Sequence, residues 1–91
     1  MARQDIPRQH DILYVIASQS DPYGLAIKGE LEKYYENEIN HGRLYPNLDE
    51  VVDKGLVEKG QLDRRTNYYA ITDEGEQIIE DRRELESQYI D

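Results

Sequence analysis

Apolar residues recur every three or four positions over the first half of the chain, which is the spacing of one face of an α-helix. This pattern predicts two helices, over residues 8–20 and 23–35, and the polar character of residues 36–41 predicts a turn after the second one. The segment Asp21-Pro22 ends the first helix, because the residue before a proline is pushed out of the α region. The two apolar faces consist of Ile12, Leu13, Ile16, Ile27 and Leu31.

A third helix is predicted over residues 42–54. Pro46 is tolerated only in the first turn of a helix, so we expect this helix to begin near Leu44 or Tyr45. Gly55 follows as a C-terminal cap, since glycine readily adopts the left-handed conformation that ends many helices. The apolar face of the third helix consists of Leu44, Leu48 and Val51.

Beyond Gly55 the pattern changes to that of a β-hairpin. Strands are predicted over residues 56–61 and 66–71, with a turn at residues 62–64. Thr72 is a good N-cap, and the acidic residues after it favour the positive end of a further helix. We expect that fourth helix to run from residue 73 to about residue 89.

These elements predict a mainly helical fold with a small β-hairpin wing. The chain has 91 residues, enough for one small domain. We expect a winged helix-turn-helix domain over residues 1–72 and a C-terminal dimerisation helix over residues 73–91, both within one compact unit. A helix followed by a two-stranded wing is an arrangement that suits a DNA-reading domain.

The fourth helix carries an apolar stripe that one small domain leaves uncovered. About 17 helical residues span roughly 25 Å, so the far end of the helix extends beyond the rest of the domain. A symmetry-related second copy would cover it, and the alternative is a frayed, solvated tail. The residues that we expect at this dimer contact are Ile78, Ile79, Arg82, Leu85 and Tyr89.

The net charge of −9, from 20 acidic and 11 basic residues, has the wrong sign for a typical nucleic-acid binder. The distribution weakens this objection, because five basic and five acidic residues balance over residues 41–69. An acidic surface with few lysines is typical of haloarchaeal proteins, which work in molar salt, and the alternative is an ordinary acidic protein of a mesophile. In the halophilic case we expect DNA binding to persist or improve as salt rises.

Four segments together resemble a known family. They are Tyr23-Gly24-Leu25-Ala26-Ile27 with Glu30-Leu31, then Arg43-Leu44-Tyr45-Pro46-Asn47-Leu48, then Lys54-Gly55-Leu56-Val57, and finally Arg64-Arg65-Thr66-Asn67-Tyr68-Tyr69-Ala70-Ile71-Thr72-Asp73-Glu74-Gly75. Their order and spacing resemble the PadR-like winged-helix transcription regulators over roughly residues 12–79. The resemblance implies a sequence-specific regulator, typically a repressor, that binds a pseudo-palindromic site on double-stranded DNA as a homodimer.

Under this resemblance the third helix reads the DNA. Arginine can bridge guanine O6 and N7 and asparagine can bridge adenine N6 and N7, each worth about 1–3 kcal/mol of discrimination. The recognition-helix candidates are Arg43, Tyr45 and Asn47, and the wing candidates are Lys59, Arg64, Arg65 and Asn67. Lys28 and His41 are weaker candidates for backbone contacts. The alternatives are a solvated helix face for Arg43 and Asn47, and packing against the first helix for Tyr45.

Other functions find less support. Without cysteine there is no disulfide or Cys-based zinc site, and the two histidines, His10 and His41, are far apart, so we expect no metal and no cofactor. No catalytic motif is present, and we do not expect an enzyme. No apolar run is long enough to span a membrane, so a cytoplasmic protein is expected.

Two further possibilities stay open. Some PadR-like proteins bind flat aromatic effectors through tryptophans, which this chain lacks. The other is a winged-helix protein-interaction module without DNA binding. This alternative is favoured if Asp49, Glu50 and Asp63 neutralise the positive charge of the face that would contact DNA.

Overall fold

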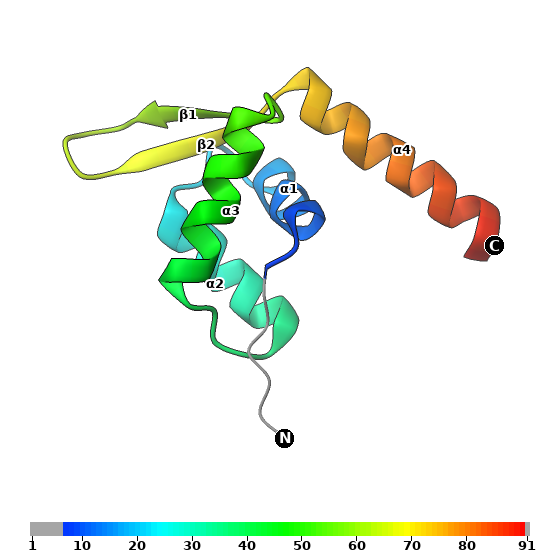
Figure 1. Cartoon of the computed structure of the whole chain (residues 1–91), viewed down its shortest axis with the longest axis horizontal. Coiled ribbons are helices and arrows are strands. Elements are labelled where there is room, and N and C mark those ends of the chain that lie inside the picture. Colours follow the sequence, from blue (N-terminus) through cyan, green and yellow to red (C-terminus); the bar gives the residue numbers. More distant parts are fainter. Residues whose placement is uncertain (1–6, 91) are drawn as a thin grey trace.

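The computed structural model describes residues 7–90, with side chains through residue 89. Three helices form a bundle, an antiparallel hairpin extends from it on one side, and the last helix projects on the other (Figure 1). The expected mainly helical winged fold is confirmed. The elements are α1 (Gln9–Ser18), α2 (Gly24–Tyr35), α3 (His41–Asp53), β1 (Val57–Gln61), β2 (Asn67–Ile71) and α4 (Asp73–Ile90).

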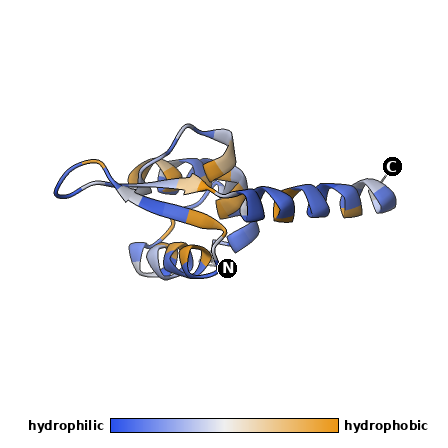
Figure 2. Ribbon diagram, turned by 90° about the horizontal axis from the view of Figure 1, so that it is seen from above, coloured by the Kyte–Doolittle hydropathy of each residue, from blue (hydrophilic) through white to orange (hydrophobic). Residues whose placement is uncertain are grey.

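The hydrophobic core lies where α1, α2 and α3 meet the base of the hairpin. All of the apolar residues predicted for the first three helix faces are buried. Ile39, within the segment predicted as a polar turn, is also buried and anchors the connection between α2 and α3. By contrast α4 is largely hydrophilic, with a few separated apolar positions along it (Figure 2).

The third helix lies within one residue of its predicted range, 42–54, but the expectation that Pro46 places its start near Leu44 or Tyr45 was wrong. Helix α3 begins at His41, because the Asn40 side chain caps it by accepting a hydrogen bond of 2.6 Å from the Gly42 N–H. Pro46 therefore lies in the second turn, where it cannot supply the bond to the Gly42 carbonyl. The cap and the complete burial of Leu44 compensate for that lost bond.

Two predicted caps are confirmed at the ends of the hairpin. Gly55 has a φ of +78°, and the N–H groups of Gly55 and Leu56 bond back to the carbonyls of Val52 and Val51, which closes α3. The Thr72 hydroxyl accepts the Gly75 N–H at 3.1 Å and donates to the Gly55 carbonyl at 2.7 Å. The end of α3 and the start of α4 are thus joined directly.

The hairpin is held against the bundle by a short third segment. The Tyr69 N–H donates to the Pro22 carbonyl at 2.9 Å, and Tyr23 forms a single bridge with Tyr68. Tyr69 itself is buried in the core. The wing is therefore fixed to the start of α2 as well as to the end of α3.

Candidate nucleic-acid interface

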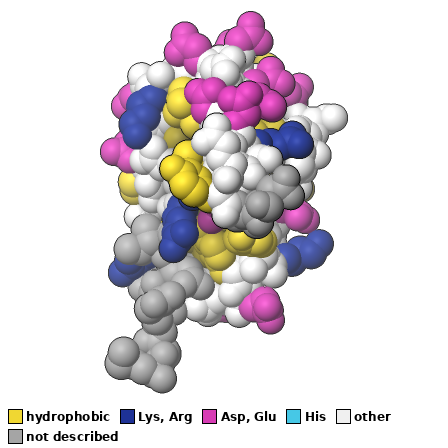
Figure 3. Space-filling view, turned by 90° about the vertical axis from the view of Figure 1, so that its right-hand side faces the viewer, with side chains coloured by type: hydrophobic (Ala, Val, Ile, Leu, Met, Phe, Trp, Pro, Cys, Tyr) yellow, Lys and Arg dark blue, Asp and Glu magenta, His cyan; other side chains and the backbone are white. Residues whose placement is uncertain are grey.

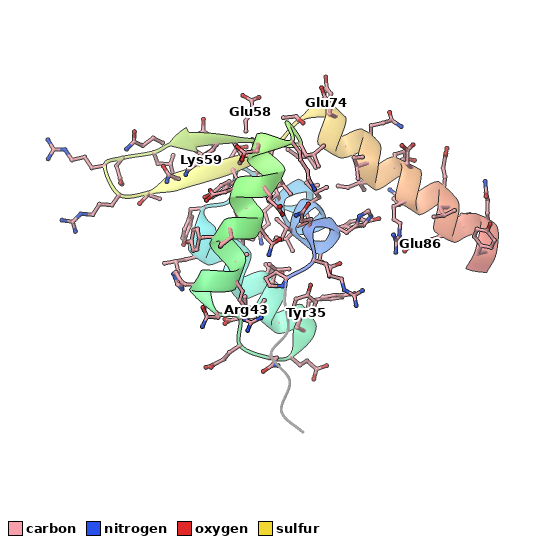
Figure 4. The ribbon with its side chains drawn as sticks, in the orientation of Figure 1. Tyr35, Arg43, Glu58, Lys59, Glu74 and Glu86 are labelled. Carbon is pink, nitrogen blue, oxygen red and sulfur yellow. The ribbon has the colours of Figure 1, made fainter. Side chains whose placement is uncertain are left out.

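The start of α3 presents an arginine to solvent. Because Leu44 and Leu48 turn inward, Arg43 is exposed on the outer side of the helix, at the end that lies away from the hairpin (Figure 4). Within the described residues Arg43 forms no ion pair. Its guanidinium group is free to bind an acceptor on another molecule.

Asn47, one turn further along α3, is half-buried and its amide is already engaged. Its Nδ2 donates to the Arg43 carbonyl at 2.8 Å, and its Oδ1 accepts from the Gln9 side chain at 3.4 Å. Gln9 also donates to Glu50 and accepts from Lys54 Nζ at 2.7 Å. Gln9 links α1 to the face of α3, a role that the sequence did not indicate. To read a base, Asn47 would have to exchange these bonds.

Tyr45 packs against the start of α2. A Cβ atom added at Gly24 would overlap the Tyr45 hydroxyl, so glycine is needed for this approach. The Tyr45 ring also stacks on His41, with ring centroids 5.1 Å apart, and His41 is exposed at the first position of α3.

The tip of the wing is shaped by a carboxylate. Asp63 Oδ1 accepts hydrogen bonds from the N–H groups of Arg65 and Thr66, at 2.9 and 3.0 Å. The bond from the Arg65 N–H contributes most to lowering the pKa of Asp63, and the bond from Thr66 adds to it. The turn is therefore capped by a charged carboxylate. Around this turn, Lys59, Arg64 and Arg65 are exposed and Asn67 is half-buried.

Lys28 is occupied inside the domain. Its Nζ pairs with Glu32 at 2.9 Å, and the same carboxylate oxygen accepts the Ile39 N–H at 2.9 Å. The Ile39 bond and then Lys28 lower the pKa of Glu32. Lys28 therefore supports the connection to α3, and a phosphate contact by it stays a prediction.

Acidic residues share the outer side of α3. Its charged side chains are one arginine, Arg43, and three carboxylates, Asp49, Glu50 and Asp53, all exposed. The local charge is most favourable for DNA at the start of α3 and at the wing tip. It is least favourable along the C-terminal half of α3.

The expected dimer stripe is exposed on α4. Ile78, Leu85 and Tyr89 are 39%, 48% and 80% exposed. Apolar side chains show between acidic and basic ones on the side of the molecule from which α4 projects (Figure 3). Ile79 is different, because it is buried in the subunit's own core and attaches α4 to the bundle.

A cavity of about 750 Å³ opens between α4 and the bundle. It is lined by residues of α1, α2 and α4, among them Tyr14, Tyr34 and Arg82. Arg82 pairs with Glu86 of its own helix at 3.2 Å, and Glu86 lies on the side of α4 that faces α1 (Figure 4). The far part of α4 therefore leaves an open space beside the bundle.

The model of the transcriptional regulator PadR-like family matches residues 12–81. The chain belongs to this family. Two structures of RosR from the haloarchaeon Halobacterium salinarum, one a complex designated RosR-S1 and one grown from NaBr, are each 55% identical to it. Each match covers 90% of this chain, with a TM-score of 0.83. It covers 73% of the RosR chain in the first structure and 74% in the second.

More distant structures share the fold alone. The Streptococcus mutans protein smu.1704 is 24% identical, with a TM-score of 0.74, over 89% of this chain and 76% of its own. No curated protein matches the chain. The predicted resemblance to haloarchaeal PadR-like regulators is confirmed, and the protein is a transcriptional regulator with a winged-helix fold.

Two further properties concern the described part of the chain. Between residues 7 and 90 no helix is long and apolar enough to cross a membrane. No group of three or more His, Cys, Asp or Glu residues that could hold a metal ion occurs there either.

Proposed function

We propose that this regulator binds double-stranded DNA sequence-specifically, as a homodimer, and represses transcription from a pseudo-palindromic operator. One observation carries the proposal. In a chain with 20 acidic and 11 basic residues, the exposed Arg43, Arg64 and Arg65 form no ion pair within the described residues. They sit on the two elements that a winged helix presents to DNA.

Helix α3 and the wing would contact different parts of the DNA. Helix α3 would enter the major groove with its N-terminal end, where Arg43 would bind a guanine edge and Asn47 an adenine edge. The rigid wing would carry Arg64 and Arg65 to the adjacent backbone or minor groove. Tyr45 and His41 would approach a phosphate between these two contacts.

A homodimer would explain the open side of α4. Ile78, Leu85 and Tyr89 need a covering surface, and the cavity beside α4 is a space that a second copy could fill. Arg82 and Glu86 at its edge could then exchange their pairing across the two chains. Two-fold symmetry would place two α3 helices about one helical turn of DNA apart, which predicts the half-site spacing.

The test begins by selecting bound sequences from a random DNA pool at high potassium concentration. An enriched pseudo-palindrome would support the proposal and supply the operator. Arg65→Ala should then weaken binding to the operator and to scrambled DNA alike, since phosphate contacts position the protein. Asn47→Ala should weaken mainly the operator, and equal losses on both DNAs would remove Asn47 from base reading.

Repression needs its own measurement, because DNA binding does not set the direction of regulation. Transcription from a promoter that contains the selected operator should fall when the regulator is added. An increase would leave DNA binding in place but replace repression by activation.

The second candidate, a protein-interaction module, is favoured by one observation. Asp49, Glu50 and Asp53 give the C-terminal half of α3 an acidic surface, which suits a basic partner better than DNA. A pool selection that enriches no sequence, with a protein shown to be folded, would favour this candidate. In that case charge reversal at Glu50 and Asp53 should abolish partner binding.

A further inference from the structure

The exposed large apolar side chains of the described residues fall into two groups. Four of them are Tyr34 at the end of α2 and Ile78, Leu85 and Tyr89 on α4, the helix of the proposed dimer contact. The other three, Tyr23, Leu25 and Leu62, are 47%, 59% and 62% exposed and lie between the start of α2 and the wing. Neither base reading nor dimerisation accounts for this second group.

These three side chains line one cavity of about 390 Å³. Its remaining lining residues are Gly24, Tyr45, Arg65, Thr66, Asn67 and Tyr69. The cavity therefore has apolar walls, one cation and no carboxylate. The two larger cavities of this acidic protein each have carboxylates in their lining, for example Glu30 and Glu74.

Both walls of this cavity, which we call the wing cavity, are held in place. One wall belongs to α2, whose start is tied to β2 by the bond between the Tyr69 N–H and the Pro22 carbonyl. The other belongs to the wing tip, where the Leu62 N–H donates to the Thr66 carbonyl at 2.8 Å and Asp63 caps the turn. Leu62 is thus presented to solvent by a defined backbone.

The chemistry of this lining fits a sugar-phosphate chain. A deoxyribose ring offers apolar C–H faces to Leu25 and Leu62, and the adjoining phosphate offers a charge to Arg65. No carboxylate lines this cavity, so a phosphate bound there would face fewer negative charges than in the other two cavities, although the charged Asp63 caps the adjoining turn. The wing cavity also adjoins Arg64 and Asn67, so a strand of DNA that reaches the wing would pass over it.

We infer that the wing cavity is a clamp for the DNA backbone, in which Leu25 and Leu62 hold a deoxyribose and Arg65 holds its phosphate. The inference rests on the proposed DNA binding and adds an apolar component to it. This component matters most in concentrated salt. At 1 M salt the Debye length is about 3 Å, so charge attraction is screened while apolar contact is not.

The experiment measures binding of the selected operator duplex by fluorescence anisotropy at low and at molar KCl. Leu62→Asn replaces the leucine by a polar group of similar shape, and Leu62→Met is the matched apolar control. Leu62→Asn should weaken binding about tenfold in molar KCl, the loss expected for one buried leucine contact, whereas Leu62→Met should stay within about twofold. Leu25→Asn tests the opposite wall and should give a similar loss.

Salt dependence separates the apolar contacts from the ionic one. The loss caused by Arg65→Ala should shrink as KCl rises, and the loss caused by Leu62→Asn should persist or grow. Equal affinities of Leu62→Asn and Leu62→Met in molar KCl would overturn the clamp while leaving DNA binding in place. A wild-type protein that binds no selected duplex would overturn both the clamp and the proposed function.

Discussion

The proposed dimer through α4 gives the sharpest prediction, because Ile78, Leu85 and Tyr89 are exposed in the single chain. Leu85 is 48% exposed in the single chain, and Ser87, two residues further on, is exposed on roughly the opposite side of the helix. Leu85→Asp should therefore disrupt a dimer without unfolding the domain. Ser87→Asp adds the same charge near the same end of α4 and is the matched control.

The magnitude follows from the exposed half of Leu85. Burying a whole leucine side chain contributes about 1.5–3 kcal/mol, so covering the exposed half contributes about 1 kcal/mol per chain and twice that per symmetric dimer. Aspartate loses this contribution and places a carboxylate in an apolar contact, which costs at least a few kcal/mol more. Together these effects should raise the dimer dissociation constant by about a thousandfold.

Light scattering coupled to size-exclusion chromatography measures the mass directly, since one chain weighs 10.7 kDa. In molar KCl the wild type and Ser87→Asp should elute with twice that mass, and Leu85→Asp with the mass of one chain. Circular dichroism should show that all three remain helical. A wild type that is monomeric at tens of micromolar, or a Ser87→Asp variant that dissociates as readily as Leu85→Asp, would refute the reasoning.

Three further predictions concern the fold. Gly75→Ala should lower the free energy of unfolding by about 2 kcal/mol, because a methyl group there would overlap backbone and side-chain atoms packed against α4. Gly29→Ala, with open space around it, should raise the free energy of unfolding by about 0.5–1 kcal/mol. Thermal melts compare the two variants. Asn40→Ala removes the cap of α3 and should cost about 1 kcal/mol by urea titration, and no change would discount the cap. Burial, and then the 2.6 Å bond to Asp11, raise the pKa of Tyr35 to about 12 from 10.0, so its stabilising contribution is complete below pH 10 and is lost between pH 10 and 12. Tyrosinate absorbance should show that Tyr35 ionises only near pH 12, and Asp11→Asn should lower the pKa of Tyr35. Ionisation of Tyr35 near pH 10 in the folded protein would contradict this raised pKa.

Much of the architecture could be predicted from local sequence signals. The apolar spacing located four helices, and Gly55 and Thr72 marked the ends of the hairpin, because caps depend on neighbouring residues along the chain. The family resemblance was also carried by short segments in a fixed order. The start of α3 was misplaced because the penalty of Pro46 was judged locally, without the Asn40 cap and the buried Leu44.

The sequence by itself determined the elements, the core faces and the residue types that can meet DNA. Only the tertiary structure decided which of those residues are available. It engaged Asn47 with Gln9, paired Lys28 with Glu32, and buried Ile79 while leaving Leu85 exposed. It also brought Leu25 and Leu62 to one acid-free cavity. These outcomes depend on contacts between elements far apart in the chain, and neither periodicity nor composition records which elements meet.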